Sequence, residues 1–96
     1  MELEKKILEI VYKTIDNINK ELNLNMDQSY DTAIIGQDSK LDSLGVFTFI
    51  TNLENQIEND FKQNISLIND DFLNGHTEHL ENVKQLQKYL IPILEE

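Results

Sequence analysis

The sequence predicts an all-α fold, a small four-helix bundle of three main helices and one short helix. Apolar residues recur at intervals of three and four in three separate stretches, which places them on one face of a helix. A long polar segment separates the first two stretches, and a short segment ending in Gly75 precedes the last. The chain has 96 residues, enough for one domain, so we expect a single unit over residues 1–96.

The first helix is expected over Glu2–Glu21. Its apolar face consists of Leu3, Ile7, Ile10, Val11, Ile15, Ile18 and Leu22. The periodicity is lost after Asn23, and polar residues accumulate up to Asp42. We therefore predict a long loop over Asn23–Asp42 with a short apolar anchor at residues 33–35. A connection of this length in a compact domain is often functional.

The second helix is expected over Ser43–Asn59, with an apolar stripe of Val46, Ile50, Leu53 and Ile57. The β-branched and aromatic run at residues 48–51 weakly favours a strand, but the spacing and the length favour a helix. A connecting loop then contains Phe61, Ile65, Leu67 and Ile68.

The end of the chain is expected to form a short helical turn and a final helix. Asn69 is the predicted N-cap of the turn, the acids at 70 and 71 suit its positive end, and Gly75 closes it. Thr77 is the predicted N-cap of the last helix. The apolar face of that helix consists of Leu80, Val83, Leu86 and Leu90, and Pro92 either ends it or lies in its last turn.

The composition is strongly acidic, with 18 Asp and Glu against 8 Lys and Arg and a net charge of -10. We expect no nucleic-acid or anionic-membrane partner, because both require clustered positive charge. A basic protein partner suits this charge, although acidity also serves solubility alone. The chain has no cysteine and therefore no thiol of its own. With no secretory signal or long apolar run in the sequence, we expect a cytoplasmic monomer.

The tripeptide Asp42-Ser43-Leu44 stands where the long loop meets the second helix. Asp and Ser are common N-caps, so a purely structural role is one interpretation. A serine at a helix N-terminus also presents its hydroxyl at an accessible corner. This motif, the long loop before it and the order of helices resemble the acyl carrier protein family, in which an Asp-Ser-Leu serine carries a phosphopantetheine arm. The resemblance covers nearly the whole chain.

The resemblance implies a four-helix bundle of acyl-carrier-protein type and a carrier that is not itself an enzyme. Ser43 would carry a covalent 4'-phosphopantetheine, attached by a phosphopantetheinyl transferase, and acyl intermediates would travel on it as thioesters in fatty acid-like or specialised biosynthesis. Asp42 and Leu44 would flank the site in recognition, Asp42 also contacting the magnesium ion in the transferase. Acyl-loading ligases or synthases would be further partners. The expected partner surface is Val46, Phe47, Glu54 and Glu58.

The chain departs from common fatty-acid-synthesis carriers at Gly45, where those proteins often have an acid. Acids return only at Glu54, Glu58 and Asp60. This difference indicates a specialised carrier. D-alanyl carrier proteins also place a glycine after their Asp-Ser pair, so an aminoacyl cargo is an alternative. A second alternative is an acidic helical interaction module without a prosthetic group, docking through the helix that contains Phe47 and Phe49.

Two histidines, His76 and His79, lie three residues apart beside Glu78. They lack a third fixed ligand, so we expect loop or surface histidines and no metal site. The remaining serines, Ser29, Ser39 and Ser66, have no His-Asp partners at a motif spacing, and a hydrolase triad is not supported.

Overall fold

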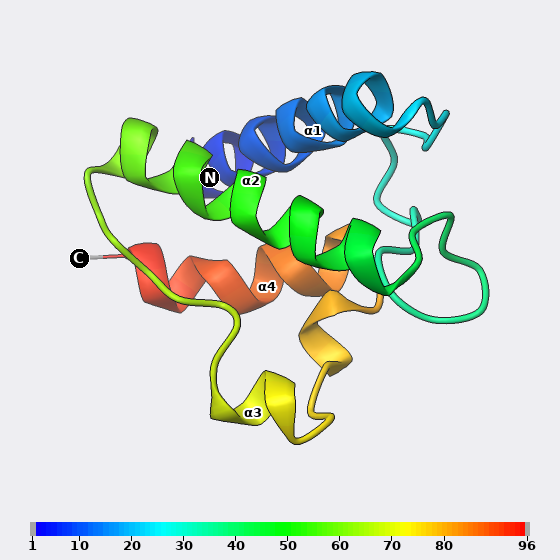
Figure 1. Cartoon of the computed structure of the whole chain (residues 1–96). Coiled ribbons are helices and arrows are strands. Elements are labelled where there is room, and N and C mark those ends of the chain that lie inside the picture. The colour runs from blue at the N-terminus through cyan, green and yellow to red at the C-terminus, as the bar shows by residue number, and fades with distance from the viewer. Residues whose placement is uncertain (1, 96) are drawn as a thin grey trace.

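The computed structural model describes residues 2–95 and confirms the small all-α bundle (Figure 1). Its elements are α1 (Glu2–Leu22), α2 (Ser43–Phe61), α3 (Asp70–Leu73), a 3₁₀ turn η1 (Glu78–Leu80) and α4 (Val83–Leu94). α1 packs against both α2 and α4, whereas α3 stands apart on the side away from α1 (Figure 1). Within residues 2–95, every helix is too short or too polar to cross a lipid bilayer.

The core forms where the apolar faces of α1, α2 and α4 meet. The predicted apolar stripes of these helices are buried, together with Phe49 and Leu94, except that Leu3 and Leu22 at the two ends of α1 are only partly buried. Burial of these side chains is the main force that assembles helices of this length. One polar bond joins the two ends of the chain within this core: the buried Gln87 Nε2 donates to the Glu4 carbonyl at 2.8 Å.

The first two helices are slightly longer than predicted. α1 extends to Leu22 and ends at Asn23, whose φ of 57° lies in the left-handed region. α2 extends to Phe61, so the prediction that Phe61 belongs to a loop is wrong. Lys62 ends α2 with φ 57°, and its N–H donates to the Glu58 carbonyl at 3.0 Å. Non-glycine residues in this conformation are favoured only where such a terminal bond compensates.

The prediction that Thr77 caps the last helix is wrong. Thr77 precedes η1 without a side-chain capping bond, and Leu80 lies in η1. α4 begins at Val83, with Asn82 as its N-cap and the Asn82 side chain accepting from the Gln85 N–H at 2.9 Å. The physical reason is a pairing with the long loop. The N–H groups of Ile34 and Ile35 donate to the carbonyls of residues 81 and 80, which holds this backbone outside a helix.

The long connection between α1 and α2 is an ordered strap. Its apolar residues Met26, Ile34 and Leu41 are buried, which confirms the predicted anchor around residue 34. An isolated antiparallel bridge joins Ala33 to Asn82. The first N–H groups of α4 donate back to the carbonyls of residues 32 and 30, each at 3.1 Å. This strap fixes the point at which the chain enters α2.

The short helix forms as predicted. Asn69 caps α3 by accepting from the Phe72 N–H at 3.1 Å, and the acids at 70 and 71 occupy its first turn. Gly75 follows with φ 86°, a backbone conformation that favours glycine. Pro92 lies inside α4, within the last turn before Leu94.

Candidate functional site

Ser43 is the first residue of α2 and is exposed at the corner where the strap enters the helix. Among the described residues, none accepts a hydrogen bond from its hydroxyl. Asp42, the residue before it, is the N-cap of α2 with an extended backbone (φ -83°, ψ -175°). The structure thus assigns the capping role to Asp42, and the hydroxyl of Ser43 remains accessible to a modifying enzyme.

Two hydrogen bonds fix this corner. Asp42 Oδ1 accepts from the Gly45 N–H at 2.7 Å, and the Asp42 carbonyl accepts from the Val46 N–H at 2.9 Å. A capping bond of this kind stabilises a helix by about 1 kcal/mol. The Asp42 carboxylate also lies at the positive end of the 19-residue α2, whose first turn contains no acid. Because the cap uses Oδ1, the other carboxylate oxygen of Asp42 remains available to an outside group.

Gly45 has a packing role that the sequence did not reveal. A Cβ at this position would lie 3.1 Å from Leu41 Cδ2 and 3.2 Å from Asp42 Oδ1, both tighter than ordinary contact. The absence of a side chain lets Leu41 and the capping carboxylate close over the first turn of α2. Local packing therefore accounts for a glycine at this position.

Two residues just before the motif brace the strap, and sequence reasoning missed them. Ser39 Oγ donates to the Ile34 carbonyl at 2.6 Å and accepts from the Leu41 N–H at 3.0 Å. Lys40 Nζ donates to both the carbonyl and the side-chain oxygen of Asn25, each at 2.9 Å. Ser, Lys and Asn are common in loops, so no local pattern distinguishes these bracing residues from solvated ones.

A largely apolar pocket of about 430 Å³ opens directly beside Ser43. The strap, α2 and α3 each contribute to its lining, which consists of Ile35, Gly36, Leu41, Asp42, Ser43, Val46, Phe47 and Phe72. Phe47 and Phe72 meet edge to face across it, with ring centroids 5.7 Å apart and an interplanar angle of 76°. The geometry thus places a nucleophilic hydroxyl next to an apolar cavity that has aromatic walls.

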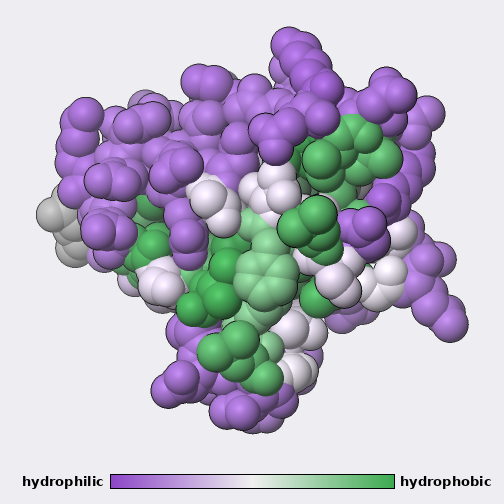
Figure 2. Space-filling model, in the orientation of Figure 1, coloured by the Kyte–Doolittle hydropathy of each residue, from purple (hydrophilic) through white to green (hydrophobic). Residues whose placement is uncertain are grey.

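A second pocket of about 260 Å³ lies on the other side of the same corner. It is lined by Leu22, Leu24, Lys40, Leu41, Asp42, Leu44 and Gly45. Leu44 is 74% exposed and therefore lies outside the core. Figure 2 shows apolar and neutral atoms gathered across the middle of this face and down toward α3, while hydrophilic atoms cover α1.

The structure exposes some residues of the predicted partner surface and buries or engages others. Phe47 is 42% exposed and Glu58 is exposed, as a surface role requires. Val46 is buried, so it contributes to the core and to the pocket wall rather than to an open surface. Glu54 is half-buried, and its Oε2 accepts from the Leu67 N–H at 2.6 Å. The Glu54 carboxylate therefore holds the connection between α2 and α3.

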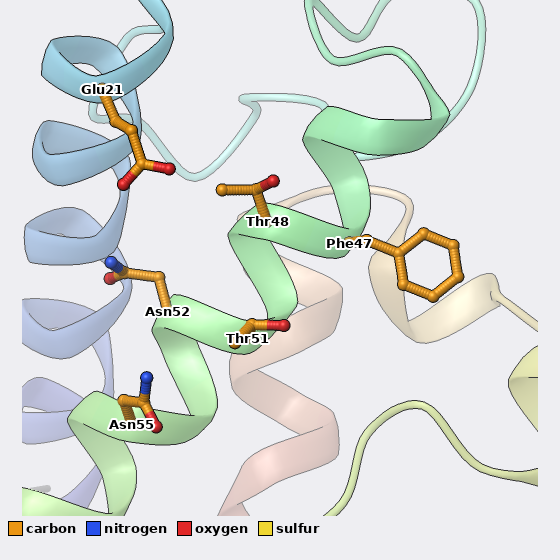
Figure 3. Close-up of a pocket in the computed structure, with 6 residues that line it drawn as sticks. All are labelled: Glu21, Phe47, Thr48, Thr51, Asn52 and Asn55. Carbon is orange, nitrogen blue, oxygen red and sulfur yellow. The ribbon is translucent and has the colours of Figure 1, made fainter.

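A polar groove of about 330 Å³ runs between the end of α1 and the exposed side of α2 (Figure 3). Glu21 reaches toward it from α1, and α2 contributes Thr48, Thr51, Asn52 and Asn55, with Phe47 at its edge. The Phe47 side chain points away from Glu21, toward the opposite side of α2 (Figure 3). The exposed side of α2 therefore has a polar edge toward α1 and an aromatic edge toward α3.

The two histidines have different environments. His76 is exposed, with Nδ1 3.8 Å from Asp71 Oδ1. His79 is half-buried and stacks on Tyr89 of α4, with ring centroids 4.1 Å apart, and its Nε2 is buried without a hydrogen bond. Burial lowers the pKa of His79, while the Glu78 and Asp71 carboxylates oppose this shift. Within residues 2–95, no three His, Cys, Asp or Glu side chains gather into a possible metal site.

Comparison with family models, with curated proteins and with solved structures finds no match to this chain. The functional interpretation therefore depends on the geometry of the chain itself and on the residues of the Asp42-Ser43-Leu44 corner.

Proposed function

We propose that this chain is an acyl carrier protein, with Ser43 as the attachment point of a 4'-phosphopantetheine arm. The observation that carries the proposal is the exposed Ser43 hydroxyl at the start of α2, beside the apolar pocket walled by Phe47 and Phe72. The arm would supply the thiol that the chain lacks, so that acyl groups are carried as thioesters. The chain itself would bind and present the cargo without catalysing a reaction.

The residues at this corner fit such a group. A phosphodiester on Ser43 would lie at the N-terminal end of a 19-residue helix, where the helix dipole favours negative charge. The Asp42 side chain is held in place by its bond to the Gly45 N–H, and its second oxygen is free to contact the magnesium ion of a transferase. The adjacent pocket provides an apolar environment for part of an acyl cargo.

We further propose that the carrier is a specialised one. Residues 43–53 contain no charged side chain, and the Glu54 carboxylate is engaged with the Leu67 N–H. In place of an acid-rich recognition helix of the general type, α2 has an uncharged N-terminal half, with its acids confined to residues 54–60. Partners would be a phosphopantetheinyl transferase and an acyl-loading ligase or synthase. The packing role of Gly45 weakens the argument for a D-alanyl cargo, because the glycine has a local structural reason.

The test is intact-protein mass spectrometry after incubation with coenzyme A, magnesium and a broad-range phosphopantetheinyl transferase. We expect the parent chain to gain one phosphopantetheinyl group and Ser43→Ala to gain none. Ser39→Ala is a matched control, because Ser39 lies in the same segment but braces the strap. Ser43→Ala is expected to leave the fold intact, because Asp42 supplies the cap. No mass gain with several transferases would favour an interaction module without a prosthetic group.

A further inference from the structure

The face around Ser43 has two exposed apolar side chains that bear on what can dock there. Leu44 is one of the most exposed large apolar residues, and it borders the pocket that Leu22 and Leu24 line. Phe47 is also exposed and borders the pocket on the other side of Asp42. An enzyme that reaches the Ser43 hydroxyl must approach the helix start at which Leu44 and both pockets lie.

The charge of this face differs from that of the rest of the molecule. The chain has a net charge of -10, yet residues 43–53 carry no charged side chain. The first acid beyond this stretch is Glu54, whose Oε2 accepts a hydrogen bond from the Leu67 N–H at 2.6 Å. A partner with a strongly basic docking face would find no matching charge along this part of α2, whereas an apolar face would be complementary to it.

Two carboxylates lie at the border of the uncharged stretch: the exposed Asp42, whose Oδ1 caps α2, and Glu21 at the end of α1. Glu21 reaches toward the groove that contains Thr48, Thr51, Asn52 and Asn55 (Figure 3). The hydroxyl and amide groups of this groove offer hydrogen bonds without net charge. A basic side chain of a partner would pair with Glu21 there, at the rim of the contact, where such a pair is exposed and contributes little.

We infer that the enzymes acting at Ser43 dock through an apolar surface centred on Leu44 and Phe47, with basic groups only at its border, where they face Asp42 or Glu21. This inference rests on the proposed carrier function and specifies the chemistry of its partners. Binding is driven by burial of Leu44 and Phe47 against apolar side chains of the enzyme, which makes the docking largely independent of salt. Charge steering of the kind that basic partners use contributes little.

The experiment measures KM for the chain and kcat for modification of Ser43, using the broad-range phosphopantetheinyl transferase as the probe. The variants are Leu44→Ser and Phe47→Ser. Tyr30→Ser is the matched control, because Tyr30 is 44% exposed, close to the 42% of Phe47, and lines none of the pockets beside Ser43. Thermal unfolding of each variant shows that the fold is retained.

We expect Leu44→Ser and Phe47→Ser each to raise KM by about tenfold with little change in kcat, since hot-spot truncations cost this much and the reacting groups are untouched. Tyr30→Ser should behave like the parent. Glu21→Gln should raise KM by about threefold or less, and the effect should vanish at high salt. The parent KM should change little between about 0.05 M and about 0.5 M NaCl, a range over which exposed charges become screened.

Two outcomes separate the failure of this inference from that of the proposed function. If the parent is modified but KM rises steeply with salt, or if Leu44→Ser and Phe47→Ser match Tyr30→Ser, the apolar docking surface is wrong and the carrier function stands. If the parent is not modified at all, both are overturned.

Discussion

Two long connections border the pocket at Ser43, and they are held in different ways. Residues 23–42 are tied by backbone hydrogen bonds to the start of α4 and bury Ile34 in the core. Residues 62–77 bury Leu67 in the core but make no such backbone pairing with another helix: Glu54 accepts from the Leu67 N–H, and Phe72 of α3 meets Phe47. None of the residues of α3 is buried. We therefore expect the pocket wall formed by α3 to open at a lower free energy than the wall formed by the strap.

Substitution in the fixed connection should have the largest effect. Ile34 is 0% exposed, so Ile34→Ala should lower the free energy of unfolding by about 2–5 kcal/mol through lost burial and a residual cavity. Phe72→Ala, in the other connection, should cost less, about 1–2 kcal/mol, because Phe72 is only half-buried and loses its aromatic pair together with that partial burial. Urea unfolding of both variants measures the contrast. Equal losses would show that the two walls are equally fixed.

The next effect concerns the tether of the less firmly held connection. Glu54→Ala removes the acceptor of the Leu67 N–H and should lower the free energy of unfolding by about 1–2 kcal/mol. Glu58→Ala is the matched control, because it removes the same charge from an exposed position of α2 and should change stability by less than about 0.5 kcal/mol. Hydrogen exchange should become faster at the Leu67 amide in Glu54→Ala alone. Unchanged exchange there would show that other contacts hold this connection.

A pH-dependent contact lies just beyond this second connection, where His79 of η1 stacks on Tyr89. Burial lowers the folded-state pKa of His79 below its unfolded value, so protonation is disfavoured in the folded chain. Its contribution to stability is complete above the unfolded pKa of about 6.5 and is lost as pH falls toward the lower folded pKa. The opposing carboxylates of Glu78 and Asp71 reduce this loss without reversing it.

The measurement is the melting temperature of the parent and of His79→Gln between about pH 7.5 and pH 5.5, a range that spans the histidine titration. The parent should lose stability relative to His79→Gln as the pH falls. This difference removes the background effect of the other acids, whose protonation relieves repulsion in a chain of net charge -10. His76→Gln, at an exposed position, should track the parent. A constant difference between the parent and His79→Gln would contradict the burial argument.

The same contrast explains how much could be predicted from the sequence. The three main helices follow from apolar periodicity, because each buries one face against the others. Asn69 and Gly75 were also assigned correctly, because their turn is closed by local bonds. The prediction that Thr77 caps the last helix is wrong because the start of α4 is set by pairing with residues 30–35, which are distant in sequence. No local pattern reports such a pairing.

At the site, the position of Asp42, Ser43 and Leu44 at the start of a helix is predictable from the sequence. The polar segment ends there and the apolar stripe of α2 begins. The sequence did not reveal that Glu54 reaches Leu67 or that Ser39 and Lys40 brace the strap. Each of these depends on a tertiary neighbour. Polar residues that brace the strap are of the same types as polar residues that face solvent. Only the fold distinguishes the two groups.

The smallest expected effect is at Gly45, in the first turn of α2. Replacing glycine by alanine in a helix interior stabilises it by up to about 1 kcal/mol, and by less in a first turn. A Cβ at residue 45 would also lie 3.1 Å from Leu41 Cδ2 and 3.2 Å from the capping Asp42 Oδ1. The two effects oppose each other, so Gly45→Ala should change the free energy of unfolding by less than about 0.5 kcal/mol. The same substitution in an Asp42→Ala background should be more favourable, because the contact with Oδ1 is absent, and urea unfolding of the four chains measures this coupling. If Gly45→Ala stabilises the parent by the full helix-propensity gain, and by the same amount in the Asp42→Ala background, packing does not require the glycine. The glycine after Asp42-Ser43 would then again favour an aminoacyl cargo.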